Sequence, residues 1–214
     1  IPRIYWMPDS KSLIVFRLNR LQNEIEILHA DIFSGNSKII YKETDSKWLE
    51  ITDNFKIIND GTQFLWTSEK DGFRHLYLYQ LTGQLVRQIT RGSWEVREVI
   101  GVDLKSKWIY FTATENSPAE NHLYKIDITG SNMIRLTTRQ GWHKIKMSPN
   151  CNYYLDIHSA FNTLPGIYLC EVSGKELKKL LKNGTSQIQK YQISTPEFFT
   201  IEISVGHIIY NTRI

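Results

Sequence analysis

HLYLYQLTG, residues 75–83, decides the fold, because the chain repeats this pattern twice more. The counterparts are HLYKIDITG at 122–130 and GIYLCEVSG at 166–174, and the first part of the chain keeps the closing turn at residues 33–35. Each copy is an aromatic and aliphatic run that suits a strand, followed by a glycine that suits a tight turn. The four turn glycines are 48, 47 and 44 residues apart. This spacing predicts four similar antiparallel units.

A second marker recurs in phase with the glycine turns. A polar turn precedes a β-branched or aromatic run at residues 7–16, 59–66, 104–111 and 148–155. A repeat of roughly 40–50 residues that holds about four strands is typical of a β-propeller blade. No segment keeps a helical apolar period over about 12 residues, so we expect little helix. The predicted fold is all-β, with about four blades of four antiparallel strands.

The period also sets the predicted boundaries of these blades. They cover residues 1–47, 48–92, 93–140 and 141–185, and residues 186–214 break the period. Propellers have about 4–8 blades, so four blades could close a ring. The aperiodic tail and the unpaired first strand favour an open arc of a larger propeller instead, with exit strands that lead toward another domain. Such an arc would leave the faces of its first and last blades uncovered.

The composition of the 214 residues is that of an ordinary globular protein, with 41% hydrophobic and 22% charged residues. The formal net charge is +4, but the basic residues are scattered, so we expect no nucleic-acid partner. Two cysteines, Cys151 and Cys170, are too few for a disulfide scaffold. If Tyr154 or Leu155 pairs with Cys170, Cys151 is displaced by several residues along the strand. We therefore expect two free thiols.

The sequence contains no familiar catalytic motif. It has no Gly-x-Ser-x-Gly, no glycine-rich nucleotide loop, no His-Glu-x-x-His and no Cys-x-x-Cys. His29, His75 and His122 fall near equivalent positions of successive blades. They could form a metal ring along a channel, but a repeat position that tolerates a polar aromatic side chain explains them better. We predict no catalytic residue, no metal and no cofactor in this chain.

Three segments go beyond a generic propeller pattern. They are DGFRHLYLY at residues 71–79, TRGSWEV at 90–96 and NHLYKI at 121–126. Together they resemble the β-propeller of dipeptidyl peptidase IV-type serine peptidases, in the prolyl oligopeptidase family. The resemblance covers essentially the whole chain, because residues 198–201 and 208–210 resemble the crossover into the hydrolase domain of that family.

The resemblance implies an eight-bladed propeller, of which this chain would be roughly the second half. The complete enzyme would release Xaa-Pro or Xaa-Ala dipeptides from peptide N-termini. Its Ser-Asp-His triad would lie in an α/β-hydrolase domain after residue 214, and its paired substrate-binding glutamates before residue 1. This chain alone is therefore expected to be inactive.

The resemblance also implies partners and a location. The partners would be peptides with Pro or Ala at the second position, the hydrolase domain, the early propeller blades and a second copy of the enzyme in a homodimer. The implied location is extracytoplasmic, meaning periplasmic, secreted or membrane-anchored. The chain itself has no targeting segment and no run of about 18 apolar residues.

One loop carries the remaining candidates for substrate binding. In the family, the loop after a tryptophan at the position of Trp48 can reach an extended substrate through an aromatic residue and an arginine. Here the loop is shorter and has neither residue type, which leaves Glu50 and Asp53 as candidate contacts. The alternative function is a stand-alone propeller that binds a protein partner, since propellers have many functions. A stand-alone propeller should close its ring with matching terminal strands.

Overall fold

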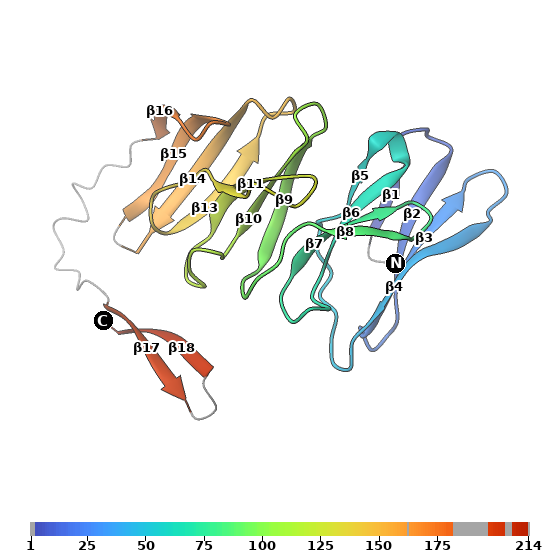
Figure 1. The fold of residues 1–214 in the computed structure, drawn as a ribbon, viewed down its shortest axis with the longest axis horizontal. Coiled ribbons are helices and arrows are strands. Elements are labelled where there is room, and N and C mark those ends of the chain that lie inside the picture. Colours follow the sequence, from blue (N-terminus) through green and yellow to red (C-terminus); the bar gives the residue numbers. More distant parts are fainter. Residues whose placement is uncertain (1–2, 162, 182–196, 204–206, 214) are drawn as a thin grey trace. The chain divides into compact units, whose positions relative to one another are not determined.

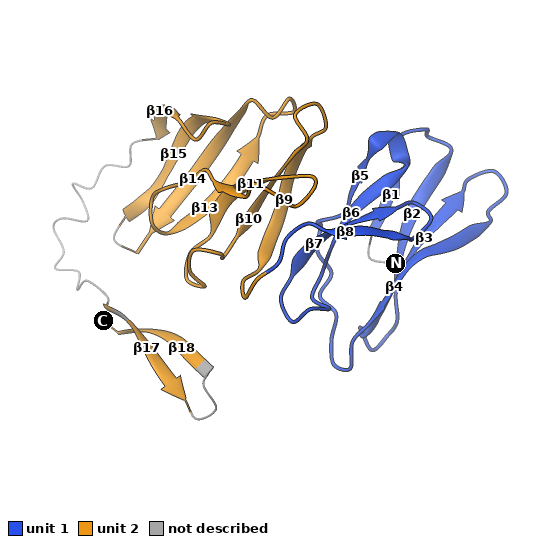
Figure 2. Ribbon diagram, viewed as in Figure 1, with its two compact units in different colours: residues 1–91 blue, residues 92–214 orange. Residues whose placement is uncertain are grey.

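The computed structural model describes residues 3–161, 163–181, 197–203 and 207–213. These residues form four antiparallel sheets of four strands and one two-stranded hairpin (Figure 1). The chain divides into two compact units, each of which contains two of the four-stranded sheets (Figure 2).

Unit 1, residues 1–91, contains the first two sheets. The first consists of β1 (Arg3–Trp6), β2 (Ser12–Leu18), β3 (Glu24–Asp31) and β4 (Ser37–Thr44). The second consists of β5 (Lys56–Ile58), the short 3-10 turn η1 (Asn59–Gly61), β6 (Gln63–Ser68), β7 (His75–Gln80) and β8 (Leu85–Gln88). Each strand pairs with its sequence neighbours, which is the up-and-down order of a propeller blade.

Unit 2, residues 92–214, contains the other two blades and the hairpin. The third blade consists of β9 (Val96–Asp103), β10 (Trp108–Ala113), β11 (His122–Asp127) and β12 (Ile134–Arg135). The fourth consists of β13 (Trp142–Met147), β14 (Tyr153–Ala160), β15 (Thr163–Glu171) and β16 (Glu176–Leu181). The hairpin is formed by β17 (Glu197–Ile203) and β18 (His207–Arg213). The predicted all-β blade architecture is confirmed, whereas residues 186–196 of the predicted exit strands lie outside the described residues.

Aromatic side chains fill the core of unit 1, where its two blades meet. The ring of Phe16 on β2 is fully buried and lies 5.3 Å from the rings of Phe55 and Trp66. Phe64 and Tyr79 of the second blade stack with their ring centroids 5.3 Å apart. Such pairs contribute beyond the burial of their area. The alternation of buried and half-buried residues along β2 aims Phe16 at this core.

The repeated glycine serves both its turn and the packing of neighbouring blades. Gly83, between β7 and β8, has a φ of +96°, and a Cβ there would overlap the carbonyl oxygen of Ile40 on β4. Gly174, in the equivalent turn of the fourth blade, has a φ of +91°. A Cβ at Gly174 would lie 2.9 Å from the carbonyl oxygen of Leu136 in the preceding blade. Only glycine combines this backbone conformation with so close an approach.

Both cysteines are free, as predicted, and both are buried. Tyr154 pairs with Cys170 across β14 and β15, and Cys151 precedes β14 at the turn. Burial raises the pKa of the Cys151 thiol and that of the Cys170 thiol. Both side chains therefore act as small apolar residues of the unit 2 core rather than as reactive thiolates.

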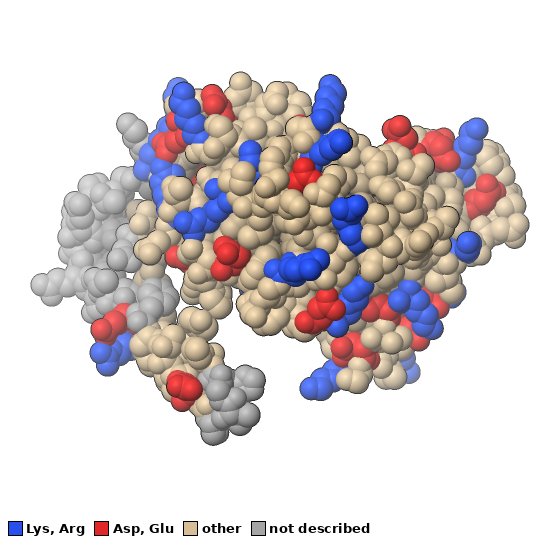
Figure 3. All heavy atoms as spheres, viewed as in Figure 1, with Lys and Arg blue, Asp and Glu red and all other residues tan. Residues whose placement is uncertain are grey.

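The surface carries charges of both signs. On the face shown in Figure 3, Lys and Arg side chains are interspersed with Asp and Glu over both units. Interspersed charges produce no extended single-sign field on that face. In the part of the chain that the structure describes, no helix has the length and apolar character needed to cross a membrane.

Candidate functional site

The loop between β4 and β5 carries the two candidate substrate contacts. Its first turn forms around Asp45, whose side chain accepts hydrogen bonds from the backbone N–H groups of Lys47 and Trp48. The backbone N–H of Leu49 then donates to the carbonyl of Gln22 at 2.8 Å, and the Leu49 side chain is buried. These contacts fix the path of the chain immediately before Glu50 and leave the Trp48 side chain 58% exposed.

Glu50 lies in an ion-pair cluster with the second blade. Its carboxylate pairs with Arg74, which also pairs with Glu69. The Arg74 side chain is only 10% exposed, whereas Glu50 and Glu69 face solvent. Burial opposes the charge of Arg74, but the hydrogen bonds and charges of the two carboxylates outweigh it and raise the pKa of the guanidinium. Arg74 therefore fastens the candidate loop to the tip of the β6–β7 hairpin.

Asp53 belongs to a different ion pair. Its carboxylate pairs with Arg3 of β1, and the hydrogen bond from this guanidinium lowers the pKa of Asp53. The two candidates thus use separate partners, so the structure does not gather them into one charged site. A cavity of about 50 Å³ lies beside Trp48, Glu50 and Arg74. This volume accommodates water but is too small for an amino-acid side chain with its backbone.

Two of the repeated histidines are structural, as the repeat suggested. The Nδ1 atom of His75 lies 3.1 Å from the hydroxyl of Thr90, and that of His122 lies 3.0 Å from the hydroxyl of Thr137. In both blades the same threonine also accepts the backbone N–H of the next residue. His29 is not part of this pattern, because it lies near the other end of its strand.

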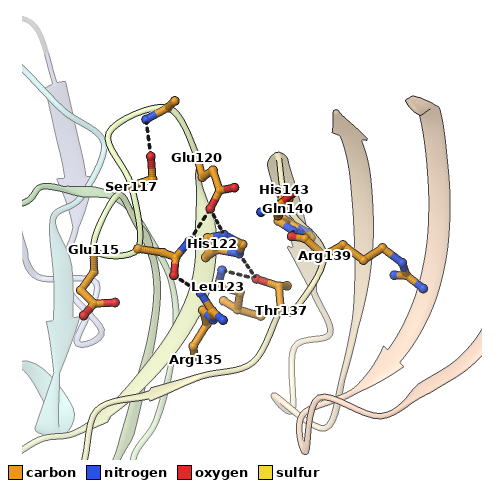
Figure 4. A network of polar contacts seen from close by, with 12 residues as sticks. Glu115, Ser117, Glu120, His122, Leu123, Arg135, Thr137, Arg139, Gln140 and His143 are labelled. Atoms are coloured by element: carbon orange, nitrogen blue, oxygen red, sulfur yellow. Dashed lines mark hydrogen bonds and ion pairs between the residues drawn. The ribbon is translucent and has the colours of Figure 1, made fainter. Parts of the chain in front are cut away.

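Sequence analysis missed a cluster of histidines in unit 2. His122, His143 and His158 pack ring against ring, with centroids 5.1 Å apart for the first pair and 4.6 Å for the second. All three side chains are buried (0–3% exposed). Figure 4 shows His122 between Glu120 and Thr137, on the side of the third blade that faces His143. No sequence motif marks this cluster, which depends on the register of the β13–β14 hairpin that places His143 opposite His158.

The cluster is not arranged around a metal. The rings pack against one another at interplanar angles of 36° and 35°, and the Nε2 atoms of His143 and His158 face backbone carbonyls. Within the described ranges, no group of three or more His, Cys, Asp or Glu side chains is placed to hold a metal ion. The chemistry open to these histidines is therefore hydrogen bonding and proton uptake.

Comparison with known protein families identifies the blades. The family of the dipeptidyl peptidase IV (DPP IV) N-terminal region matches residues 1–165. The chain belongs to this family. The match includes all of the first three blades and β13 and β14 of the fourth, and therefore the candidate loop and the histidine cluster both lie within the DPP IV N-terminal region.

Individual relatives agree with the DPP IV assignment. Dipeptidyl peptidase 4 of Arthroderma otae is 26% identical over 217 residues, which cover 96% of this chain and 28% of the relative. The same values hold for dipeptidyl peptidase 4 of Trichophyton rubrum. The crystal structure of Porphyromonas gingivalis dipeptidyl peptidase 4 matches with a TM-score of 0.90 and 29% identity, over 98% of this chain and 30% of that chain. This chain thus spans less than a third of the length of these relatives.

Proposed function

We propose that this chain is the propeller part of a dipeptidyl peptidase IV-like serine exopeptidase. The observation that carries the proposal is the likeness to the P. gingivalis dipeptidyl peptidase 4, with a TM-score of 0.90 over 98% of the chain. The proposed enzyme releases Xaa-Pro or Xaa-Ala dipeptides from peptide N-termini. Its nucleophile lies in a hydrolase domain outside this chain, which contains no nucleophile motif of its own.

The proposed role of the blades is selection of the substrate. A propeller placed over a hydrolase site admits unstructured peptide ends and excludes folded proteins. The dense aromatic core of unit 1 and the glycine contacts between blades support such a role. Blades that exclude folded proteins must be rigid, and close packing makes them so. The proposed partners are peptides with Pro or Ala at the second position, the hydrolase domain, further blades and a second copy of the enzyme. The proposed location is extracytoplasmic.

Hydrolysis of a Gly-Pro chromophore tests the proposal. The assay compares this chain alone with the full-length product of its gene. We expect turnover only by the full-length product, because the chain contains no Gly-x-Ser-x-Gly nucleophile motif. Turnover by the chain alone would contradict the proposal and place the chemistry within residues 1–214. Turnover by neither protein would also contradict it and would favour a stand-alone binding module.

We also propose Glu50 and Asp53 as contacts for the distal part of an extended peptide. The side chains of Glu50 and Asp53 are 60% and 73% exposed, so each carboxylate remains open to a second cation beside its arginine. An exposed ion pair contributes at most about 1 kcal/mol. We therefore expect Glu50→Ala to raise the KM of the full-length enzyme about twofold to fivefold for a peptide with a basic third or fourth residue.

A shorter substrate and a matched variant control for indirect effects. Glu50→Ala should leave the kinetics of a Gly-Pro chromophore unchanged, because that substrate ends before the loop. Glu69→Ala removes the other carboxylate bound to Arg74 and should leave the KM of both substrates unchanged. Unaltered turnover of the extended peptide by Glu50→Ala would refute the contact.

A further inference from the structure

The three clustered histidines all form hydrogen bonds to the linker between the third and fourth blades. This linker, residues 136–141, follows β12 and leads into β13. His122 bonds to the hydroxyl of Thr137, His143 to the carbonyl of Arg139 at 2.8 Å and His158 to the carbonyl of Gln140 at 2.8 Å. The three histidines come from β11, β13 and β14. Histidines of both blades therefore hold the linker in place through hydrogen bonds.

The ring in the middle of the cluster, that of His143, has a hydrogen-bond partner at both nitrogens. The Nδ1 atom of His143 lies 2.9 Å from each carboxyl oxygen of Asp156, and its Nε2 atom faces the carbonyl of Arg139. Because a carboxylate and a carbonyl only accept, the arrangement requires one hydrogen on Nε2 and a second hydrogen between Nδ1 and the carboxyl group. Both ring nitrogens of His143 thus already have hydrogen-bond partners.

His122 is satisfied on both sides while it is neutral. The Thr137 hydroxyl accepts the N–H of Leu123, so its own hydrogen is free to bond to Nδ1 of His122. The Nε2 atom of His122 can then donate to Glu120 at 2.9 Å (Figure 4). Burial lowers the pKa of His122 in spite of this carboxylate, so the neutral ring is the form that fits both partners.

His158 is the unbalanced member of the cluster. Its Nε2 atom donates to Gln140, but its Nδ1 atom has no hydrogen-bond partner among the described residues although the side chain is buried. A proton added to Nδ1 would create a buried donor without an acceptor, which is costly. It would also place a cation beside the ring of His143, whose centroid lies 4.6 Å from that of His158.

Other charges around His158 do not offset this cost. Asp156, on the same strand, is already bound to His143. Tyr168 of β15 places its ring 6.4 Å from that of His158, with the Arg139 guanidinium 4.1 Å from the centre of the tyrosine ring. Glu176 of β16 is paired with Arg139. The nearby carboxylates therefore have partners of their own, and Arg139 adds positive charge.

We propose that His158 is a proton sensor whose protonation releases the linker between the third and fourth blades. The neutral ring holds the carbonyl of Gln140, and protonation makes the closed arrangement unfavourable. Opening moves the His158 ring to water, where both nitrogens can donate. The backbone bonds that join the two blades beside the linker then weaken. They run from the N–H of Asn121 to Gly141 and from the N–H of His143 to Asn121.

The direction of the pH effect follows from the environment of His158. Burial, together with the charges of His143 and Arg139, lowers the pKa of His158 in spite of the hydrogen bond to Gln140 and the charge of Asp156. A histidine exposed to water titrates near pH 6.5. The open state therefore binds more protons than the closed state below about pH 6.5. The closed arrangement of His158 and the linker is therefore fully stable above that pH, and its stability decreases as the pH falls toward the lowered pKa.

Hydrogen exchange of the full chain tests the sensor. We expect the protection factors of the Asn121 and His143 amides, corrected for intrinsic exchange rates, to fall about tenfold between pH 7.5 and 5.5. The Leu81 and Ile89 amides serve as an internal reference, since they bond to Thr62 and Leu76 within unit 1, whereas the cluster belongs to unit 2. Their protection should change less than twofold.

Variants of His158 separate the sensor from other titrating groups. His158→Gln keeps a donor for Gln140 but does not titrate, and His158→Phe keeps the ring contact with His143. We expect either variant to remove the pH dependence at Asn121 and His143, whereas His75→Gln, a matched change in unit 1, should preserve it. A flat pH profile in the wild-type chain would overturn the proposal, and so would a tenfold change that persists in a folded His158 variant.

Discussion

Replacing Phe16 with alanine is expected to destabilise unit 1 by about 3–5 kcal/mol. Phe16 is fully buried, and its ring contacts those of Tyr5, Phe55 and Trp66, which come from both blades of the unit. The substitution removes the burial of a phenyl ring and leaves a cavity that these large neighbours cannot close by small movements. The loss should therefore affect the first and second blades together.

The measurement is native-state hydrogen exchange of the β2 and β6 amides in increasing urea. Phe33→Ala is the matched control, because Phe33 is 80% exposed at the β3–β4 turn. It should change the free energy of unfolding by less than about 0.5 kcal/mol. A Phe16→Ala loss as small as that of the control would show that the aromatic cluster does not hold the blades together.

Replacing Asp156 with alanine is expected to destabilise unit 2 by a similar amount, about 3–5 kcal/mol. Asp156 is buried, and both of its oxygens lie 2.9 Å from Nδ1 of His143. Without the carboxylate, the Nδ1 atom of the buried His143 ring loses its hydrogen-bond partner. The blade that contains β13 and β14 should loosen first.

Asp156→Asn distinguishes loss of the hydrogen bond from loss of volume. An amide can donate to the neutral Nδ1 of His143 while Nε2–H still donates to Arg139, so we expect about half the loss caused by alanine. Thermal unfolding monitored by exchange of the β13 and β14 amides measures both variants. Equal losses for asparagine and alanine would contradict a role for the hydrogen bond, and no loss for either would contradict the pair as a whole.

The fold could be predicted from the sequence because its main signals are local. A turn glycine such as Gly83 and the strand before it lie within about ten residues, and the same signal recurs in every blade. The order of strands then follows from short connections between neighbours. The packing role of Gly83 against Ile40 was not accessible in this way, because it depends on how one blade sits against the next.

The candidate site could be predicted only in part. The loop position of Glu50 followed from the family resemblance, but its partner Arg74 lies 24 residues away at the tip of the β6–β7 hairpin. The histidine cluster depends on the β13–β14 register and on the path of the linker, neither of which has a sequence motif. His75 and His122 were conspicuous because they repeat, whereas His158, whose Nδ1 is one of several buried polar atoms without a partner among the described residues, does not.

The reactivity of the two buried thiols can report how often unit 2 opens. Both cysteines lie in unit 2, and unit 1 has none. A thiol that is buried and has a raised pKa reacts with an alkylating reagent only during moments when the surrounding strands part. The rate of alkylation of the unmodified chain under native conditions therefore measures how often unit 2 alone opens. Cys151 reports on the β13–β14 turn, and Cys170 reports on β15, close to His143 and Asp156. At high reagent concentration the labelling rate becomes the opening rate itself.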